Sequence, residues 1–121
     1  MKTLIPVLIS ALCCCCCSAW AAQDNDVEMK DGNAVLRLAE AALNQKPDPL
    51  ERSKAFFFEG YVRGYTYGAP RSSVRIPDDV TLHQEVEAIH KWLKEHPDRL
   101  NKDGRVLIAK SLQEIFPAKA P

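Results

Sequence analysis

FFFEGYVRGYTYG, residues 56–68, decides the fold of this chain. The stretch holds three of the four Phe, all three Tyr and three of the five Gly. Gly60, Gly64 and Gly68 recur every four residues, so a helix aligns them on one face. Each Gly inside a helix costs about 1 kcal/mol relative to Ala, and close approach of a second helix can offset that cost. The pattern therefore predicts a central helix with a face for helix packing.

A second, bulky face lies beside the glycines and carries Phe57, Tyr61 and Tyr65 at i, i+4 and i+8. A helix with both faces is contacted on more than one side. Two packing partners remain open for the glycine stripe. One is the first helix of the same chain, where Ala39 and Ala42 are small. The other is a second copy of the chain in a homodimer.

Apolar spacing and capping residues predict four helices, at residues 34–44, 49–67, 78–96 and 104–116. Asp48 with Glu51, and Thr81 with Gln84, have the spacing of capping boxes at the second and third helices. Gly68 is the expected C-terminal stop of the second helix. Alternation long enough for a strand is absent from the sequence. The expected fold is all-α, a small bundle of about four helices without a sheet.

The N-terminus has the features of a secretory signal peptide. Lys2 precedes an apolar run that is too short to span a bilayer, and Ala19-Trp20-Ala21 is a small-x-small cleavage pattern. We expect residues 1–21 to be cleaved, residues 22–32 to form a flexible lead, and residues 33–118 to form one domain. All five cysteines lie in the cleaved segment. The mature domain must therefore be held together by packing rather than by disulfides.

Charge gives no sign of a polyanionic partner. Cleavage removes Lys2 alone among the charged residues, so 15 of the 16 basic residues and all 16 acidic residues remain. This balance gives no electrostatic argument for binding nucleic acid or a membrane surface. A single soluble domain, exported to the periplasm, is the expectation.

Catalytic and metal-binding patterns are weak. His83, Glu87 and His90 share one helix face, but no other mature segment supplies a matching ligand, and a solvated polar face is the favoured explanation. No cysteine nucleophile remains after processing, and no serine has a Gly-x-Ser-x-Gly context. We expect no enzyme activity, no metal and no cofactor.

Residues 69–77 form the one irregular segment of any length, with prolines at both ends. Loops on rigid scaffolds often carry function, and aromatic and Arg side chains are common anchors of interfaces. The candidate partner-binding residues are therefore the exposed end of the second helix and this loop, namely Tyr65, Tyr67, Arg71 and Arg75. For Tyr65, burial in the core is an equal alternative.

Four motifs together resemble the Rap/Tai family of type VI secretion immunity proteins. They are FFEGYVRG at 57–64, IPDDVT at 76–81 followed by Gln84, WLKEHP at 92–97, and Phe116-Pro117. The resemblance spans roughly residues 33–118. It implies a small exported helical protein, often dimeric, that binds and blocks a secreted peptidoglycan-cleaving amidase toxin in the periplasm.

The chain departs from the family pattern in its cysteines. The resemblance places them at Phe58, Arg75 and Ala118, with a fourth near Ala39, and all are replaced here. The expected consequence is that the loop at 69–77 lacks an anchor at Arg75. The alternative function is a general periplasmic helical interaction or chaperone-like module without a dedicated toxin.

Overall fold

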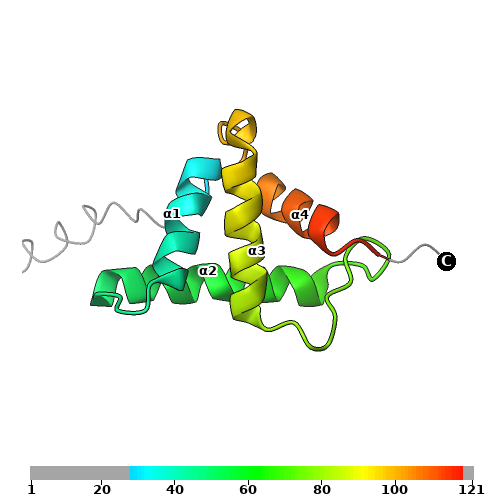
Figure 1. Ribbon diagram of the computed structural model, residues 1–121, viewed down its shortest axis with the longest axis horizontal. Coiled ribbons are helices and arrows are strands. Elements are labelled where there is room, and N and C mark those ends of the chain that lie inside the picture. The colour runs from blue at the N-terminus through cyan, green and yellow to red at the C-terminus, as the bar shows by residue number, and fades with distance from the viewer. Residues whose placement is uncertain (1–27, 119–121) are drawn as a thin grey trace, which may run out of the picture.

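The computed structural model describes residues 28–118, which form four α-helices and one short 3₁₀ helix (Figure 1). Helix α2 (Pro49–Gly68) runs across the base of the molecule, and α3 (Leu82–Glu95) crosses its middle between α1 (Gly32–Leu43) and α4 (Gly104–Ile115). Helix α3 contacts all the other helices. The short 3₁₀ helix η1 (Pro97–Arg99) follows α3, and the expected all-α bundle is confirmed.

Side-chain caps fix where the helices begin. The Asp31 carboxylate accepts a hydrogen bond from the Ala34 backbone N–H at 2.9 Å and so caps α1. Both predicted capping boxes form, at Asp48 with Glu51 and at Thr81 with Gln84. Each cap satisfies a backbone donor that the first helical turn leaves free.

The helix bounds differ from the expected ones at a few points. Helix α3 begins at Leu82 rather than at residue 78, because its cap is Thr81. Gly68 is the last residue of α2 and has a negative φ, so it does not supply a left-handed cap. The connection between α3 and α4 contains η1, which begins at Pro97.

The core lies between one face of α2 and the helices α1 and α3, and α4 packs on α1 and α3. Helix α2 buries Ala55, Phe58 and Val62 on that face. Burying a side chain the size of Phe58 contributes about 1.5–3 kcal/mol. The other fully buried large apolar side chains are Val35, Val86, Ile89, Leu93, Ile108 and Leu112.

The glycine stripe faces away from this core. A Cβ built on Gly60, Gly64 or Gly68 would meet no atom within 4 Å among the described residues. The first of the two open alternatives, packing of the stripe against the first helix, is therefore wrong. Helix α1 packs instead on the face that carries Phe58 and Val62.

The bulky face is also rotated from its expected position. Phe57 is 43% exposed, whereas Tyr61 and Tyr65 are partly buried against the core. Since Phe58 and Val62 take the inward positions, Phe57 lies at the edge of the buried face.

Two other glycines allow close approach. A Cβ on Gly32 would lie 2.8 Å from the Cα of Leu100, and one on Gly104 would lie 2.6 Å from the carbonyl oxygen of Met29. Met29 is buried, and the Gly32 N–H donates to the Leu100 carbonyl at 2.9 Å. The packed domain thus begins before residue 33, within the segment expected to be a flexible lead.

The predicted signal peptide and the first part of the lead lie outside the described residues. Between residues 28 and 118, no helix has the length and apolar character needed to cross a bilayer.

Candidate functional site

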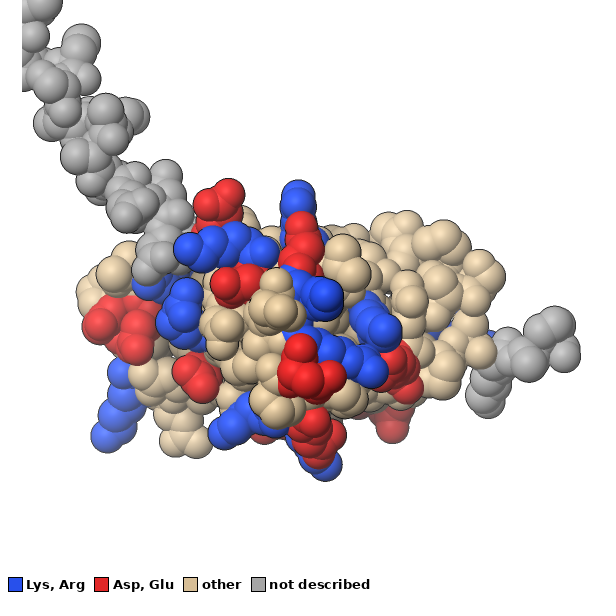
Figure 2. All heavy atoms as spheres, turned by 90° about the horizontal axis from the view of Figure 1, so that it is seen from above, with Lys and Arg blue, Asp and Glu red and all other residues tan. Residues whose placement is uncertain are grey.

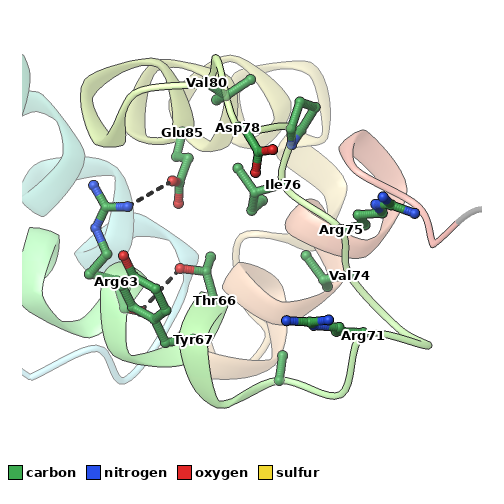
Figure 3. Close-up of a pocket in the computed structure, with 12 residues that line it drawn as sticks. Arg63, Thr66, Tyr67, Arg71, Val74, Arg75, Ile76, Asp78, Val80 and Glu85 are labelled. Carbon is green, nitrogen blue, oxygen red and sulfur yellow. Dashed lines mark hydrogen bonds and ion pairs between the residues drawn. The ribbon is translucent and has the colours of Figure 1, made fainter.

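A cavity of about 590 Å³ lies between the C-terminal end of α2, the following loop and the start of α3 (Figure 3). Its walls come from segments that the sequence separates by up to 22 positions, from Arg63 to Glu85. The lining residues that the argument uses are Arg63, Tyr67, Arg71, Arg75, Asp78 and Glu85.

Three of the four predicted partner-binding residues line this cavity. Tyr67 is 80% exposed at the end of α2, and Arg71 and Arg75 are exposed on the loop. In Figure 3 the Arg71 guanidinium extends along the cavity mouth, whereas Arg75 turns away toward the C-terminal segment. Tyr67, Arg71 and Arg75 therefore line one cavity, and the Arg75 guanidinium is directed away from it.

Tyr65 lies elsewhere. It is partly buried, packs against the core, and its hydroxyl accepts a hydrogen bond from the Gln113 side chain of α4 at 3.3 Å. Because α-helical positions 65 and 67 differ by two residues, Tyr65 and Tyr67 point to different sides of α2. Tyr65 thus follows the alternative of packing against the core.

The loop is held by its own backbone and by the C-terminal segment. The Ser73 N–H and the Ser73 hydroxyl both donate to the Pro70 carbonyl oxygen, at 2.9 and 2.8 Å. Val74 is buried and forms an isolated antiparallel bridge with Pro117. These contacts fix the backbone that carries Arg71 and Arg75.

Arg63 joins the exposed rim to the cavity interior. Its guanidinium lies 5.7 Å from the centroid of the Tyr67 ring, within the range of a cation–π contact. Its Nη1 atom lies 3.7 Å from Oε1 of Glu85. This distance is longer than a hydrogen bond, so the two groups attract each other electrostatically but form no hydrogen bond.

Glu85 is the buried charged group of the site. It is only 1% exposed. Burial raises the pKa of its carboxyl group, and the nearby Arg63 partly offsets that rise. A buried carboxylate loses its hydration, and a single cation without a hydrogen bond to it compensates that loss only in part.

Arg63 and Glu85 were missed as site residues in the sequence. A signal for Glu85 existed, because it stands next to Val86 on the apolar side of α3, one turn before Ile89. An acidic residue at an inward position points to a special environment. Nothing in the sequence marked Arg63 as its partner, since the pair depends on how α2 and α3 cross.

The candidate metal ligands do not converge. His83 lies 3.6 Å from Glu87 on the same helix, whereas His90 lies 3.6 Å from Glu40 of α1. Residues 28–118 hold no group of three or more His, Cys, Asp or Glu side chains arranged to bind a metal ion.

Charges on the surface are mixed. Lys and Arg alternate with Asp and Glu over the face seen in Figure 2, without a broad region of one sign. The sequence carries equal numbers of basic and acidic residues. Local geometry at the cavity, rather than an overall field, must therefore provide selectivity.

A family model described as Rap1a immunity proteins matches residues 31–118. The chain belongs to the Rap1a immunity protein family. The match covers all four α-helices and the loop beside the cavity. Comparison with curated proteins and with solved structures gave no significant match.

Membership in the Rap1a family implies an immunity protein that acts against a secreted toxin. Such a protein works by binding a protein partner, which agrees with a surface built from an aromatic ring and arginines. The resemblance inferred from the four sequence motifs is confirmed by this match.

Proposed function

We propose that this Rap1a protein is a periplasmic immunity protein that binds a type VI secreted peptidoglycan amidase and occludes its active site. The observation that carries the proposal is the family match over residues 31–118. The expected signal peptide at residues 1–21 supports export. The protein would act stoichiometrically, by covering a cleft rather than by chemistry of its own.

The surface around the cavity is the proposed contact with the toxin. Tyr67 is exposed at the end of α2, and Arg71 and Arg75 are exposed on the loop whose backbone the Val74–Pro117 bridge holds in place. A backbone that is already fixed loses little conformational entropy on binding, and aromatic and guanidinium groups are frequent anchors of interfaces.

Co-export provides the direct test. The full chain is expressed with the product of an adjacent open reading frame that carries its own export signal, and both lysis and co-purification are followed. A stoichiometric complex that prevents lysis supports the proposal. Lysis that the chain does not prevent contradicts it.

Mass spectrometry of the exported chain reports at the same time whether cleavage follows Ala21.

Variants of the surface locate the contact. Tyr67→Ala, Arg71→Ala and Arg75→Ala should each weaken the toxin complex about 10-fold or more, as loss of an interface anchor does. Arg52→Ala is the matched control, because Arg52 is exposed at the opposite end of α2. Equal affinity of all four variants would exclude this surface.

We also propose that the open face of α2 packs against a second copy of the chain. Phe56 is 66% exposed and stands in line with Gly60 and Gly64, where a neighbour could approach closely. Sedimentation at several concentrations tests this, with Gly64→Arg as the variant that blocks the face. A chain that stays monomeric at every concentration contradicts the proposal.

The rival function is a general periplasmic chaperone-like module. Weak binding to many unfolded proteins, with no tight complex with one toxin, would favour it. The grouping of Tyr67 with arginines at one cavity favours a dedicated partner, because clients without a common structure require broad apolar surface.

A further inference from the structure

A buried carboxylate without hydrogen-bond donors faces the cavity. Within residues 28–118, neither Oε1 nor Oε2 of Glu85 accepts a hydrogen bond. The nearest cation, Arg63, is 3.7 Å away and is also engaged with the Tyr67 ring. Buried acceptors in folded proteins are almost always satisfied, so this one marks a place where a donor from outside fits.

The cavity interior is acidic, although its rim is basic. Asp78 contributes a second carboxylate from the loop that precedes α3, and Figure 3 shows it on the same wall as Glu85. Ile76 and Val80 line the same space with apolar surface. Arg71 is exposed at the mouth and Arg75 turns outward, so neither guanidinium occupies the position before Glu85.

We propose that this cavity receives a basic side chain of the partner protein, whose ammonium or guanidinium group donates to Glu85. The inference rests on the proposed function, since that partner is the toxin. The methylene stem of the lysine or arginine would pack on Ile76 and Val80, as long cationic side chains commonly do on apolar surface. An acidic residue beside it on the toxin would meet Arg71 at the mouth.

Size and electrostatics support this occupant. A volume of about 590 Å³ lies within the range of cavities that hold small ligands, so one long side chain fits with its hydration. Burial raises the pKa of Glu85, and an incoming cation with N–H donors would compensate that desolvation. An anionic side chain would instead meet two carboxylates inside the cavity.

The first experiment uses a small probe and needs no toxin. N-acetyl-arginine amide is titrated into the exported, processed protein and followed by backbone amide NMR. The amide signals of Thr66, Ile76 and Val80 should shift and saturate at millimolar concentration. Neutral N-acetyl-citrulline amide should produce no saturating shift. Equal responses to the two probes would overturn the proposal.

Matched variants assign the effect to Glu85. Glu85→Gln keeps the side-chain shape and should weaken binding of the arginine probe at least 10-fold. Glu87→Gln makes the same change in charge on the exposed side of α3 and should have no effect. Equal binding by the wild-type and Glu85→Gln proteins would overturn the proposal, provided that both show native amide spectra.

The second experiment separates this inference from the proposed function. Glu85→Gln should weaken the toxin complex at least 10-fold, whereas Glu87→Gln should not. A toxin complex of unchanged affinity overturns the inference and leaves the immunity function standing. If the arginine probe binds saturably but no toxin complex forms, the basic side chain that enters the cavity does not come from a toxin. This outcome contradicts the proposed function as well.

Discussion

The backbone N–H of Arg75 donates a hydrogen bond of 3.1 Å to the carbonyl oxygen of Phe116. This contact adjoins the bridge between Val74 and Pro117, so the C-terminal segment runs beside the loop. The family resemblance implies cysteines at Arg75 and Ala118. The absence of these cysteines predicted that the loop lacks an anchor at Arg75. That prediction is wrong, because backbone hydrogen bonding anchors the loop at this position.

This anchor gives a prediction for local stability. The Arg75 amide should exchange with solvent slowly in the full domain, because a hydrogen-bonded amide exchanges only when the structure opens. Deleting residues 116–121 should accelerate its exchange about 10-fold or more. The measurement is hydrogen exchange by NMR. Deleting residues 119–121 alone is the control, and rapid exchange at Arg75 in the full domain would contradict the prediction.

Glu85 should make the domain more stable in mild acid. Its pKa is raised by burial in the folded state, so the folded protein binds a proton more readily than the unfolded chain. The resulting stabilisation is fully present below the ordinary carboxyl pKa and is lost as pH rises through the raised value. The charged group that acts on this carboxyl is Arg63 from α2. Arg71, Arg75 and Asp78 line the same cavity, with the Arg75 guanidinium directed away from it.

Urea unfolding at several pH values measures this effect. Glu85→Gln should be more stable than the wild type at pH 7, and its advantage should shrink as pH approaches 4.5. Glu87→Gln controls for the loss of one negative charge. A Glu85→Gln protein that is less stable than the wild type at pH 7 would mean that attraction to Arg63 outweighs desolvation.

Glu114 should act in the opposite direction. The indole N–H of Trp92 donates to Glu114 at 2.8 Å and lowers the pKa of that carboxyl, with Arg99 contributing as a nearby cation. The stabilisation is present above the ordinary carboxyl pKa and is lost as pH falls through the lowered value.

Trp92 itself reports on this contact. The chain has two tryptophans, and Trp20 lies in the segment expected to be cleaved. Fluorescence of the processed protein should therefore include a step whose midpoint lies below the ordinary carboxyl pKa, as the lowered pKa of Glu114 requires. Glu114→Ala should abolish the step, whereas Glu95→Ala, on the exposed side of α3, should leave it unchanged. A step that survives in Glu114→Ala would contradict the assignment.

Glycine substitutions should change the free energy of unfolding in opposite directions on the open stripe and at the close contacts between segments. Gly64→Ala should raise the free energy of unfolding by about 0.5–1 kcal/mol, because Ala favours the helix and the built Cβ meets no atom within 4 Å among the described residues. Gly104→Ala should lower it by about 1–3 kcal/mol, because its Cβ would lie 2.6 Å from the Met29 carbonyl oxygen. Chemical denaturation at low protein concentration measures both, and equal effects of the two changes would contradict the contrast.

Local chemistry made much of the fold predictable. Two helix starts could be predicted from capping boxes, at Asp48 with Glu51 and at Thr81 with Gln84, because a capping box depends only on residues within one turn. The stretch at 56–68 was correctly assigned to a central helix, but its inward face was not. A repeat of glycines every four residues marks a face without saying whether it is buried or open.

The site was predictable in part for the same reason. Tyr67, Arg71 and Arg75 could be selected because they end a helix and occupy a proline-bounded loop. The contribution of Arg63 and Glu85 could not be predicted from the sequence, because the two residues lie on different helices, α2 and α3. Tyr65 had two equal alternatives, and contact with Gln113 of α4 decided between them.

The sequence by itself determined the helices, their caps, the family and the loop that carries the exposed arginines. These follow from interactions between residues close in the chain and from motifs read in order. Only the tertiary structure decided which side of α2 is buried, where Arg75 is anchored, and that Glu85 lies unsatisfied in a cavity. The physical reason is that burial and long-range hydrogen bonding depend on how α1 and α3 pack on α2 and how α4 packs on α1 and α3, and local periodicity does not fix the rotation of a helix about its axis.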